Sequence, residues 1–259
     1  MTQPEPFTPP SGAAPPEQPH AAPVPAPRYG AYAPGGVPAA GGAPAAGSDP
    51  WAPPVAPAPL VPAGLATATV ALATAWVALQ VLLLATAFPA VAPYEAALAA
   101  GRPLSSVWTA YDAIGGFVMP VQVAAFVVAC LWLQQCRRVA VGLAPAARQV
   151  RGPVWVWLGW VVPVVSLWFP YQVLRDVRAA AVGGATPARL GWWWACWLIG
   201  LWSSNQAAFS AVGFGSRDPA TIPVFEGVAA VALVAGGVIW VGLVREITQA
   251  LRARLAPVA

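Results

Sequence analysis

From residue 63 onward the chain alternates between long apolar stretches and short polar segments. Four of the stretches have about the 20 residues that an α-helix needs to cross the hydrocarbon core of a bilayer. They cover residues 65–88, 114–136, 190–214 and 224–244. The pattern therefore predicts an all-α membrane protein, with four transmembrane helices in a membrane domain at residues 63–250 and a cytoplasmic C-terminal end at 251–259.

A fifth apolar stretch, residues 154–174, contains two prolines. It is long enough to cross a bilayer, but Pro163 and Pro170 each lack a backbone donor and disfavour a helical conformation of the preceding residue. A helix from Val154 to Val162 would reach only about half of the hydrocarbon thickness. We therefore predict a re-entrant segment, in which a second helix opens at Pro170 and returns to the same side.

The distribution of arginine favours the re-entrant arrangement. If residues 154–174 crossed the membrane, the twelve arginines from residue 102 onward would be divided between its two sides; if they re-enter, ten of the twelve lie on one side and only Arg102 and Arg217 on the other. Arginine accumulates on the cytoplasmic side, so we expect both termini in the cytoplasm of a bacterial cell, with the protein in its plasma membrane. Seven tryptophans are expected at the same interface, where indole rings prefer to lie: Trp132, Trp155, Trp157, Trp192, Trp193, Trp194 and Trp240.

Residues 1–62 consist mainly of proline, alanine and glycine, with no apolar periodicity. Such a segment cannot bury enough apolar surface to fold, so it is predicted to be a disordered cytoplasmic tail. A protein partner that reads proline-rich segments, or one that binds the inner loops, is a further expectation.

Composition restricts the chemistry. Hydrophobic residues make up 58% of the chain and charged residues 8%, which is the balance of a membrane protein. The arginines lie between apolar segments, so we expect contact with the lipid bilayer and not with nucleic acid. Three cysteines show no metal-ligand spacing, and the single histidine, His20, lies in the tail. No catalytic residue, metal ligand or cofactor site is predicted, and the chain is not expected to be an enzyme.

The predicted re-entrant segment holds the candidate site residues. Its motif consists of Pro163, Pro170, Tyr171, Gln172, Arg175, Asp176 and Arg178, and the basic pair Arg137 and Arg138 lies on the same side. Together they could attract anionic lipids to the inner surface. The alternative is structural: the tyrosine and the amide join the helices, and the arginines extend to the lipid headgroups.

Other polar residues in the spans invite a transport function. Residues 203–206 read SSNQ, and Glu226 lies near the start of the last span. Hydrogen bonding between helices explains the first group, and interaction with the helix dipole explains Glu226. Before the second span, Ser105 or Ser106 is predicted as a helix N-cap.

Three motifs resemble those of a bacterial multi-pass membrane family known as domain of unknown function 4328. They are CRR at 136–138, WVWLGWVVPVVSLWFPYQVLRDVRAA at 155–180 and WWWACW at 192–197. The resemblance implies a membrane domain and transfers no catalytic residue. Our interpretation is an uncharacterised integral membrane protein, an interaction or regulatory module with a basic cytoplasmic face; the alternative is a small transporter or channel subunit.

Overall fold

The computed structural model describes residues 61, 63–214 and 218–256, and all regular secondary structure in these residues is helical. The predicted all-α fold is thus confirmed for the described part of the chain. The elements are α1 (Ala63–Ala99), η1 (Leu104–Ser106), α2 (Ala110–Leu143), α3 (Trp155–Val161), η2 (Val165–Leu167), α4 (Phe169–Val182), α5 (Ala188–Ala211), η4 (Pro219–Thr221) and α6 (Ile222–Leu255). The predicted disordered tail lies outside the described residues, apart from Val61, and remains a prediction.

Three helices are long and apolar enough to cross a membrane: α1, α2 and α6, the last counted from Pro219. Helix α5 is not among them, because its tryptophans and the SSNQ sequence at 203–206 lower its mean hydropathy. The structure therefore supports a membrane protein, whereas the predicted count of four spans and a re-entrant segment is not confirmed.

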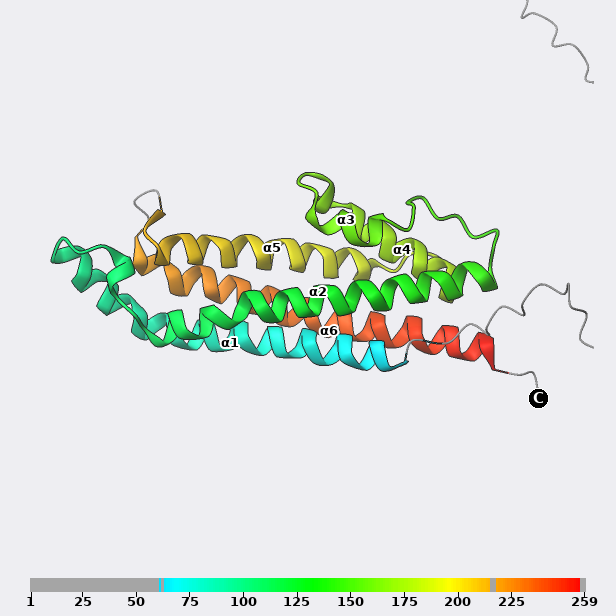
Figure 1. Ribbon diagram of the computed structural model, residues 1–259, viewed down its shortest axis with the longest axis horizontal. Coiled ribbons are helices and arrows are strands. Elements are labelled where there is room, and N and C mark those ends of the chain that lie inside the picture. The colour runs from blue at the N-terminus through cyan, green and yellow to red at the C-terminus, as the bar shows by residue number, and fades with distance from the viewer. Residues whose placement is uncertain (1–60, 62, 215–217, 257–259) are drawn as a thin grey trace, which may run out of the picture. The chain divides into compact units, whose positions relative to one another are not determined.

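The four long helices lie alongside one another (Figure 1). α1 packs on α2 and α6, and α5 packs chiefly on α6. The first residues of α1 and the last residues of α6 lie at the same end of the helices, and α4 lies near this end as well (Figure 1). Both ends of the described chain are therefore found at one end of the helices.

Helix α1 continues well beyond residue 88, where the predicted span ends, and it contains Pro89 and Pro93. A proline inside a helix removes one hydrogen bond, and tertiary packing must offset this loss. The packing comes from a buried face formed by Ala90, Tyr94 and Ala97. The phenol of Tyr94 also donates a hydrogen bond to Asp112 at the start of α2, with 2.7 Å between the oxygens.

The start of α2 differs from the prediction. Its N-cap is Thr109, whose side chain accepts a hydrogen bond from the Asp112 backbone, while the Asp112 carboxylate accepts one from the Thr109 backbone. This reciprocal capping box satisfies two free helix donors at once. The prediction of Ser105 or Ser106 as the N-cap was wrong: both belong to η1, and Ser106 donates to the carbonyl of Pro103 instead.

Residues 154–174 form two helices that contact each other, α3 and α4. Between them Val164 has φ 66° and ψ −55°, and the N–H of Val165 donates to the carbonyl of Pro163 at 2.7 Å. This is a γ-turn with a positive φ at its centre, a strained conformation for a β-branched residue. Pro170 occupies the first turn of α4, where its missing N–H costs no helical bond.

Several tryptophans lie elsewhere than predicted. Trp132 and Trp193 are 0% and 3% exposed, and both contact the ring of Trp240. The Nε1 of Trp132 donates to the hydroxyl of Thr248 at 3.2 Å. These rings belong to the core between the helices, whereas Trp192 is 67% exposed, as a residue at a membrane interface would be.

Candidate binding sites at the arginine-rich end and between the helices

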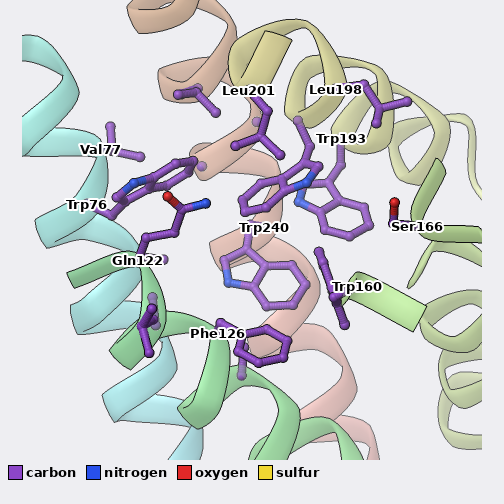
Figure 2. Close-up of a pocket in the computed structure, with 18 of the residues that line it drawn as sticks. Trp76, Val77, Gln122, Phe126, Trp160, Ser166, Trp193, Leu198, Leu201 and Trp240 are labelled. Atoms are coloured by element: carbon purple, nitrogen blue, oxygen red, sulfur yellow. The ribbon is translucent and has the colours of Figure 1, made fainter. Parts of the chain in front are cut away.

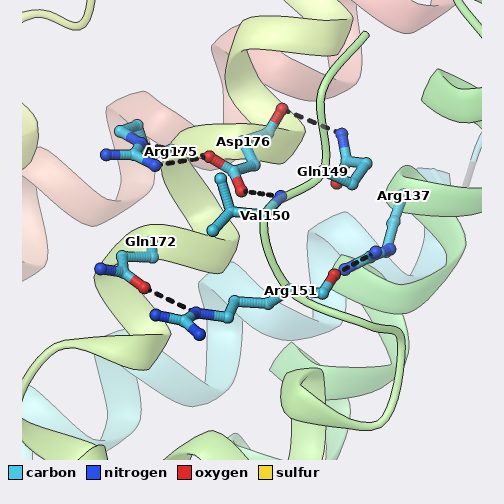
Figure 3. Close-up of polar contacts among 7 residues, drawn as sticks. All are labelled: Arg137, Gln149, Val150, Arg151, Gln172, Arg175 and Asp176. Atoms are coloured by element: carbon cyan, nitrogen blue, oxygen red, sulfur yellow. Dashed lines mark hydrogen bonds and ion pairs between the residues drawn. The ribbon is translucent and has the colours of Figure 1, made fainter. Parts of the chain in front are cut away.

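Asp176 on α4 holds the segment that precedes α3 (Figure 3). It is 6% exposed, and its Oδ2 accepts a hydrogen bond from the backbone N–H of Val150 at 2.8 Å. Its Oδ1 is paired with Arg175 at 2.9 Å. The side chain of Gln149 adds a bond to the Asp176 carbonyl at 3.3 Å. A nearly buried carboxylate is thereby surrounded by donors, as its desolvation requires.

Arg137 and Arg151 connect the same segment to α2 and α4. Arg137 is buried, and its guanidinium donates to the backbone carbonyls of Arg151 and Gly152. Arg151 in turn donates to the side chain of Gln172 at 2.8 Å and lies 3.9 Å from the ring centroid of Phe169. Both guanidinium groups have structural hydrogen-bond partners and hold the polar segment against the helices.

A second ion-pair group joins α4, α5 and α6. Glu246 accepts both Nε and Nη2 of Arg178, at 3.1 and 2.8 Å, and is paired with Arg189 at 2.6 Å. Arg178 is only 8% exposed, so this two-point contact is shielded from solvent. Arg254 near the end of α6 donates to the carbonyl of Ala180. The C-terminal part of α6 is thus fixed to α4.

These contacts define an arginine-rich end of the structure. It comprises Arg137, Arg138, Arg148, Arg151, Arg175, Arg178, Arg189, Arg245, Arg252 and Arg254. Among the described residues, only Asp176 and Glu246 are acidic there, and both are already in ion pairs. Four exposed arginines at this end have neither an ion pair nor a side-chain hydrogen bond in the described part of the chain: Arg138, Arg148, Arg245 and Arg252.

The structure brings some of the predicted site residues together and places the others apart. Gln172, Arg175 and Asp176 come together against the segment 149–151, and Arg178 pairs with α6. Pro163 is the first residue of the γ-turn, Pro170 is buried in the first turn of α4, and Tyr171 is half-buried against the core. Arg138 alone of the predicted arginines is both exposed and outside an ion pair.

The opposite end of the helices carries acidic residues. Glu226 is 1% exposed and accepts a hydrogen bond from the Tyr111 hydroxyl at 2.8 Å, which links α6 to α2. In the SSNQ sequence, Ser204 accepts a bond from Gln80 of α1, whereas Asn205 donates to its own helix at Leu201. No three His, Cys, Asp or Glu residues of the described chain are placed to hold a metal ion.

A cavity of about 460 Å³ lies between the helices, in the range of about 300–1,000 Å³ that is usual for small-ligand sites (Figure 2). α1, α2, α5 and α6 all line it, together with α3 and η2. Its walls are mainly apolar, and no charged residue of the described part of the chain lines it. Six tryptophans contribute: Trp76, Trp160, Trp193, Trp197, Trp202 and Trp240.

Ring contacts make the walls of the cavity continuous. Trp193 stacks on Trp240 with centroids 5.2 Å apart, and Trp197 contacts Trp76 at 5.1 Å and Trp160 at 5.6 Å. The Nε1 of Trp194 donates to the carbonyl of Leu167 at 2.7 Å, which fixes the reversal between α3 and α4 beside the cavity.

Two buried polar atoms in the cavity wall have no hydrogen-bond partner among the described residues: the hydroxyl oxygen of Thr69 and the indole Nε1 of Trp76. These residues are 2% and 5% exposed. The amide of Gln122 and the hydroxyl of Ser166 also line the cavity (Figure 2). Buried donors without partners are uncommon in folded proteins, so these atoms indicate a site that a polar group of a ligand would complete.

The cavity was missed in the sequence because its lining residues come from six elements. The available signal was the number of tryptophans, 14 in the chain, of which we assigned seven to the membrane interface. Trp76 stands alone in its apolar stretch, and nothing in its neighbouring residues indicates that Trp197 contacts it.

Comparison with known proteins gives one match. The model of the family described as Domain of unknown function (DUF4328) matches residues 95–249, which include α2 to α5 and most of α6. No curated protein and no solved structure matches the chain.

Proposed function

Because the chain belongs to this DUF4328 family, whose description names no activity, we propose a function from its own residues. The protein is a multi-pass membrane protein that acts as an interaction or regulatory module, and its arginine-rich end binds anionic groups at the cytoplasmic membrane surface. The observation that carries this proposal is the excess of ten arginines over two acidic residues at one end of the described helices.

The same observation supports the orientation. Arginine accumulates on the cytoplasmic side of membrane proteins, so the arginine-rich end faces the cytoplasm. Both ends of the described chain lie at this end, which is consistent with two cytoplasmic termini. In a bacterial cell the membrane in question is the plasma membrane.

We include α5 as the fourth span in this proposal. Its 24 residues give a length of about 36 Å, enough for the roughly 30 Å of a hydrocarbon core. Ile199, Trp202 and Phe209 are exposed along it, and these side chains suit contact with lipid.

The α3–α4 hairpin is proposed to enter the bilayer from the cytoplasmic side. Its turn exposes Val161, Val164 and Leu167, at 67%, 65% and 53%. A turn at membrane depth requires its backbone groups to have protein partners. Ser166 donates to the carbonyl of Val162, and the carbonyl of Leu167 accepts from Trp194, which supports this placement.

An interaction function is preferred to transport or catalysis. Transport would require a polar path from Asn205 to Arg175, but the cavity is mainly apolar and neither residue lines it. An enzyme of acid–base or nucleophilic type would require paired reactive groups, whereas Asp176 and Glu246 are each held in ion pairs with arginine. The exposed arginines are the polar groups left to contact another molecule.

The test is retention of anionic lipid by purified protein. We expect the variant with Arg138, Arg148, Arg245 and Arg252 all changed to Gln to retain several times less phosphatidylglycerol, measured by mass spectrometry after detergent extraction. The reason is that each arginine near an anionic surface contributes about 1 kcal/mol. The loss should be greater at low salt, where the charges are less screened.

Arg102→Gln provides the matched control, because Arg102 is exposed at the opposite end of the helices. It should leave retention unchanged. Equal retention by the fourfold variant and the native protein, at low and at moderate salt, would show that the arginine-rich end does not bind anionic lipid.

A further inference from the structure

The tryptophan-lined cavity has the features of a binding site that is separate from the arginine-rich end. We propose that it binds a free neutral lipid, with one apolar chain and a carbonyl oxygen that accepts a hydrogen bond from the indole N–H of Trp76. This inference does not depend on the function proposed above, because none of the ten arginines lines the cavity.

The unpaired indole identifies the polar group of the ligand. Trp76 is 5% exposed and lines the cavity, and its Nε1 lacks a partner in the described structure. An indole N–H can only donate, so its partner must be an acceptor oxygen. A quaternary ammonium, which aromatic cages bind through their ring faces, would leave this donor unpaired. Gln122, which makes no hydrogen bond in the described residues, supplies a second donor at the same cavity.

The lining restricts the rest of the ligand. The walls carry no charged side chain, and burying an unpaired charge costs far more than burying a neutral group. A charged headgroup is thus excluded, and the apolar walls fit a hydrocarbon chain. A phospholipid has a charged headgroup and therefore does not meet the first condition.

The ligand can enter from the side. The cavity separates α2 from α5, since α2 packs chiefly on α1 and α5 on α6. Met119 of α2 and Trp202 of α5 are 66% and 60% exposed at its border. An opening between apolar exposed side chains admits a molecule dissolved in a bilayer.

Quenching of tryptophan fluorescence tests the proposal in the full-length protein. The probe is a brominated fatty acid methyl ester, because bromine quenches indole emission on contact. The comparison probes are the brominated alkane of equal length and a phosphatidylcholine with brominated chains. We expect saturable quenching by the ester, weaker binding of the alkane, and only non-saturable quenching by the phospholipid.

Trp76→Phe removes the donor and keeps an aromatic ring. We expect it to weaken ester binding about fivefold, the effect of losing one hydrogen bond, and to leave alkane binding unchanged. The smaller ring also loses packing against Trp197 and should lower the thermal stability somewhat, so unchanged alkane binding is the evidence that the cavity still forms in this variant. Trp192→Phe, an exposed tryptophan of α5 outside the cavity, is the matched control.

Ala73→Phe fills the cavity and should abolish saturable quenching, whereas Ala75→Phe, on an exposed position of the same helix, should preserve it. Three results would overturn the proposal: no saturable quenching by the ester, equal ester binding by the native and Trp76→Phe proteins, or saturable quenching by the phospholipid that Trp76→Phe weakens equally.

Discussion

At the scale of single residues, the Asp176 carboxylate fixes the segment that precedes α3 to α4. It is 6% exposed, accepts the backbone N–H of Val150 and is paired with Arg175, whose side chain is 33% exposed. The two interactions differ in the parts of the chain that they connect. The bond to Val150 joins separate segments, while the ion pair joins sequence neighbours on one helix.

We therefore expect Asp176→Ala to destabilise the protein by about 1–3 kcal/mol, because it leaves the Val150 N–H without its partner. Trypsin should then cleave faster after Arg148 and Arg151. Arg175→Gln removes only a partly exposed ion pair and should cost about 0–1 kcal/mol. Thermal unfolding in detergent measures both, and equal effects of the two changes would contradict this account.

Val164 is a second residue whose effect on stability can be predicted. Its φ of 66° is strained for a β-branched side chain, at a cost on the order of 1–3 kcal/mol. Val164→Gly removes the strain, but it raises the conformational entropy of the unfolded chain, which lowers the free energy of unfolding by about 0.4–1 kcal/mol. We expect a net rise in the melting temperature. Val161→Gly, inside α3, should lower it; a fall in both variants would show that the turn is not strained.

At the scale of elements, the contact between α5 and α6 depends on Gly200. A Cβ at this position would lie 2.4 Å from Cγ of Leu233, which is 2% exposed. Two buried helices cannot move apart without losing apolar contacts, so a methyl group here would displace the Leu233 side chain from its packed position.

Gly200→Ala should accordingly destabilise by about 1–3 kcal/mol through overpacking. Gly191, on the same helix, has nothing within 4 Å of a built Cβ. Gly191→Ala should stabilise slightly, because alanine has the higher helix propensity. Chemical denaturation of the two variants provides the comparison, and a stabilising Gly200→Ala would contradict the packing described here.

How far the elements could be predicted depends on whether local or distant residues determine them. The helices at residues 65–88 and 224–244 can be predicted from the length of their apolar stretches. Pro163 and Pro170 indicate that residues 154–174 do not form one continuous helix, and the structure shows two helices there, α3 and α4. The extension of α1 past Pro89 could not be predicted, because it depends on the bond from Tyr94 to Asp112. The capping box at Thr109 was readable as T-x-x-D, although Ser105 and Ser106 were preferred.

At the scale of the whole molecule, the orientation in a membrane is testable by cysteine labelling. Two exposed positions suit this purpose: Thr186, between α4 and α5, and Ser105, in η1 at the opposite end. We expect an impermeant thiol reagent, added to intact cells without native cysteines in the protein, to label Ser105→Cys and not Thr186→Cys.

Labelling of Thr186→Cys from outside would reject the cytoplasmic placement of the arginine-rich end. It would also reject the re-entrant placement of the α3–α4 hairpin, because that hairpin precedes Thr186 in the chain. Disruption of the membrane should make both positions reactive, which shows that each cysteine is accessible to the reagent.

The candidate sites differ in how much of them the sequence could reveal. Counting arginines was enough to predict a basic end, because charge depends on composition and order along the chain. It could not predict that Arg178 is held by Glu246, 68 residues away. The cavity was not predictable at all, since the contact of Trp76 with Trp197 exists only after four helices have packed.

The separation of charge between the two ends has a consequence for the energised cell. Ten arginines less two carboxylates leave eight positive charges at the arginine-rich end. At the opposite end of the helices, the charged residues that the structure describes are Glu95, Asp112, Asp218, Glu226 and Arg102. A plasma membrane that is negative inside acts on each charge with about 2.3 kcal/mol per 100 mV. If the arginine-rich end faces the cytoplasm as proposed, inverting the protein would move these charges against the field, so the membrane potential favours the proposed orientation. Dissipating the voltage during synthesis should increase the inverted fraction, and after insertion it should have no effect.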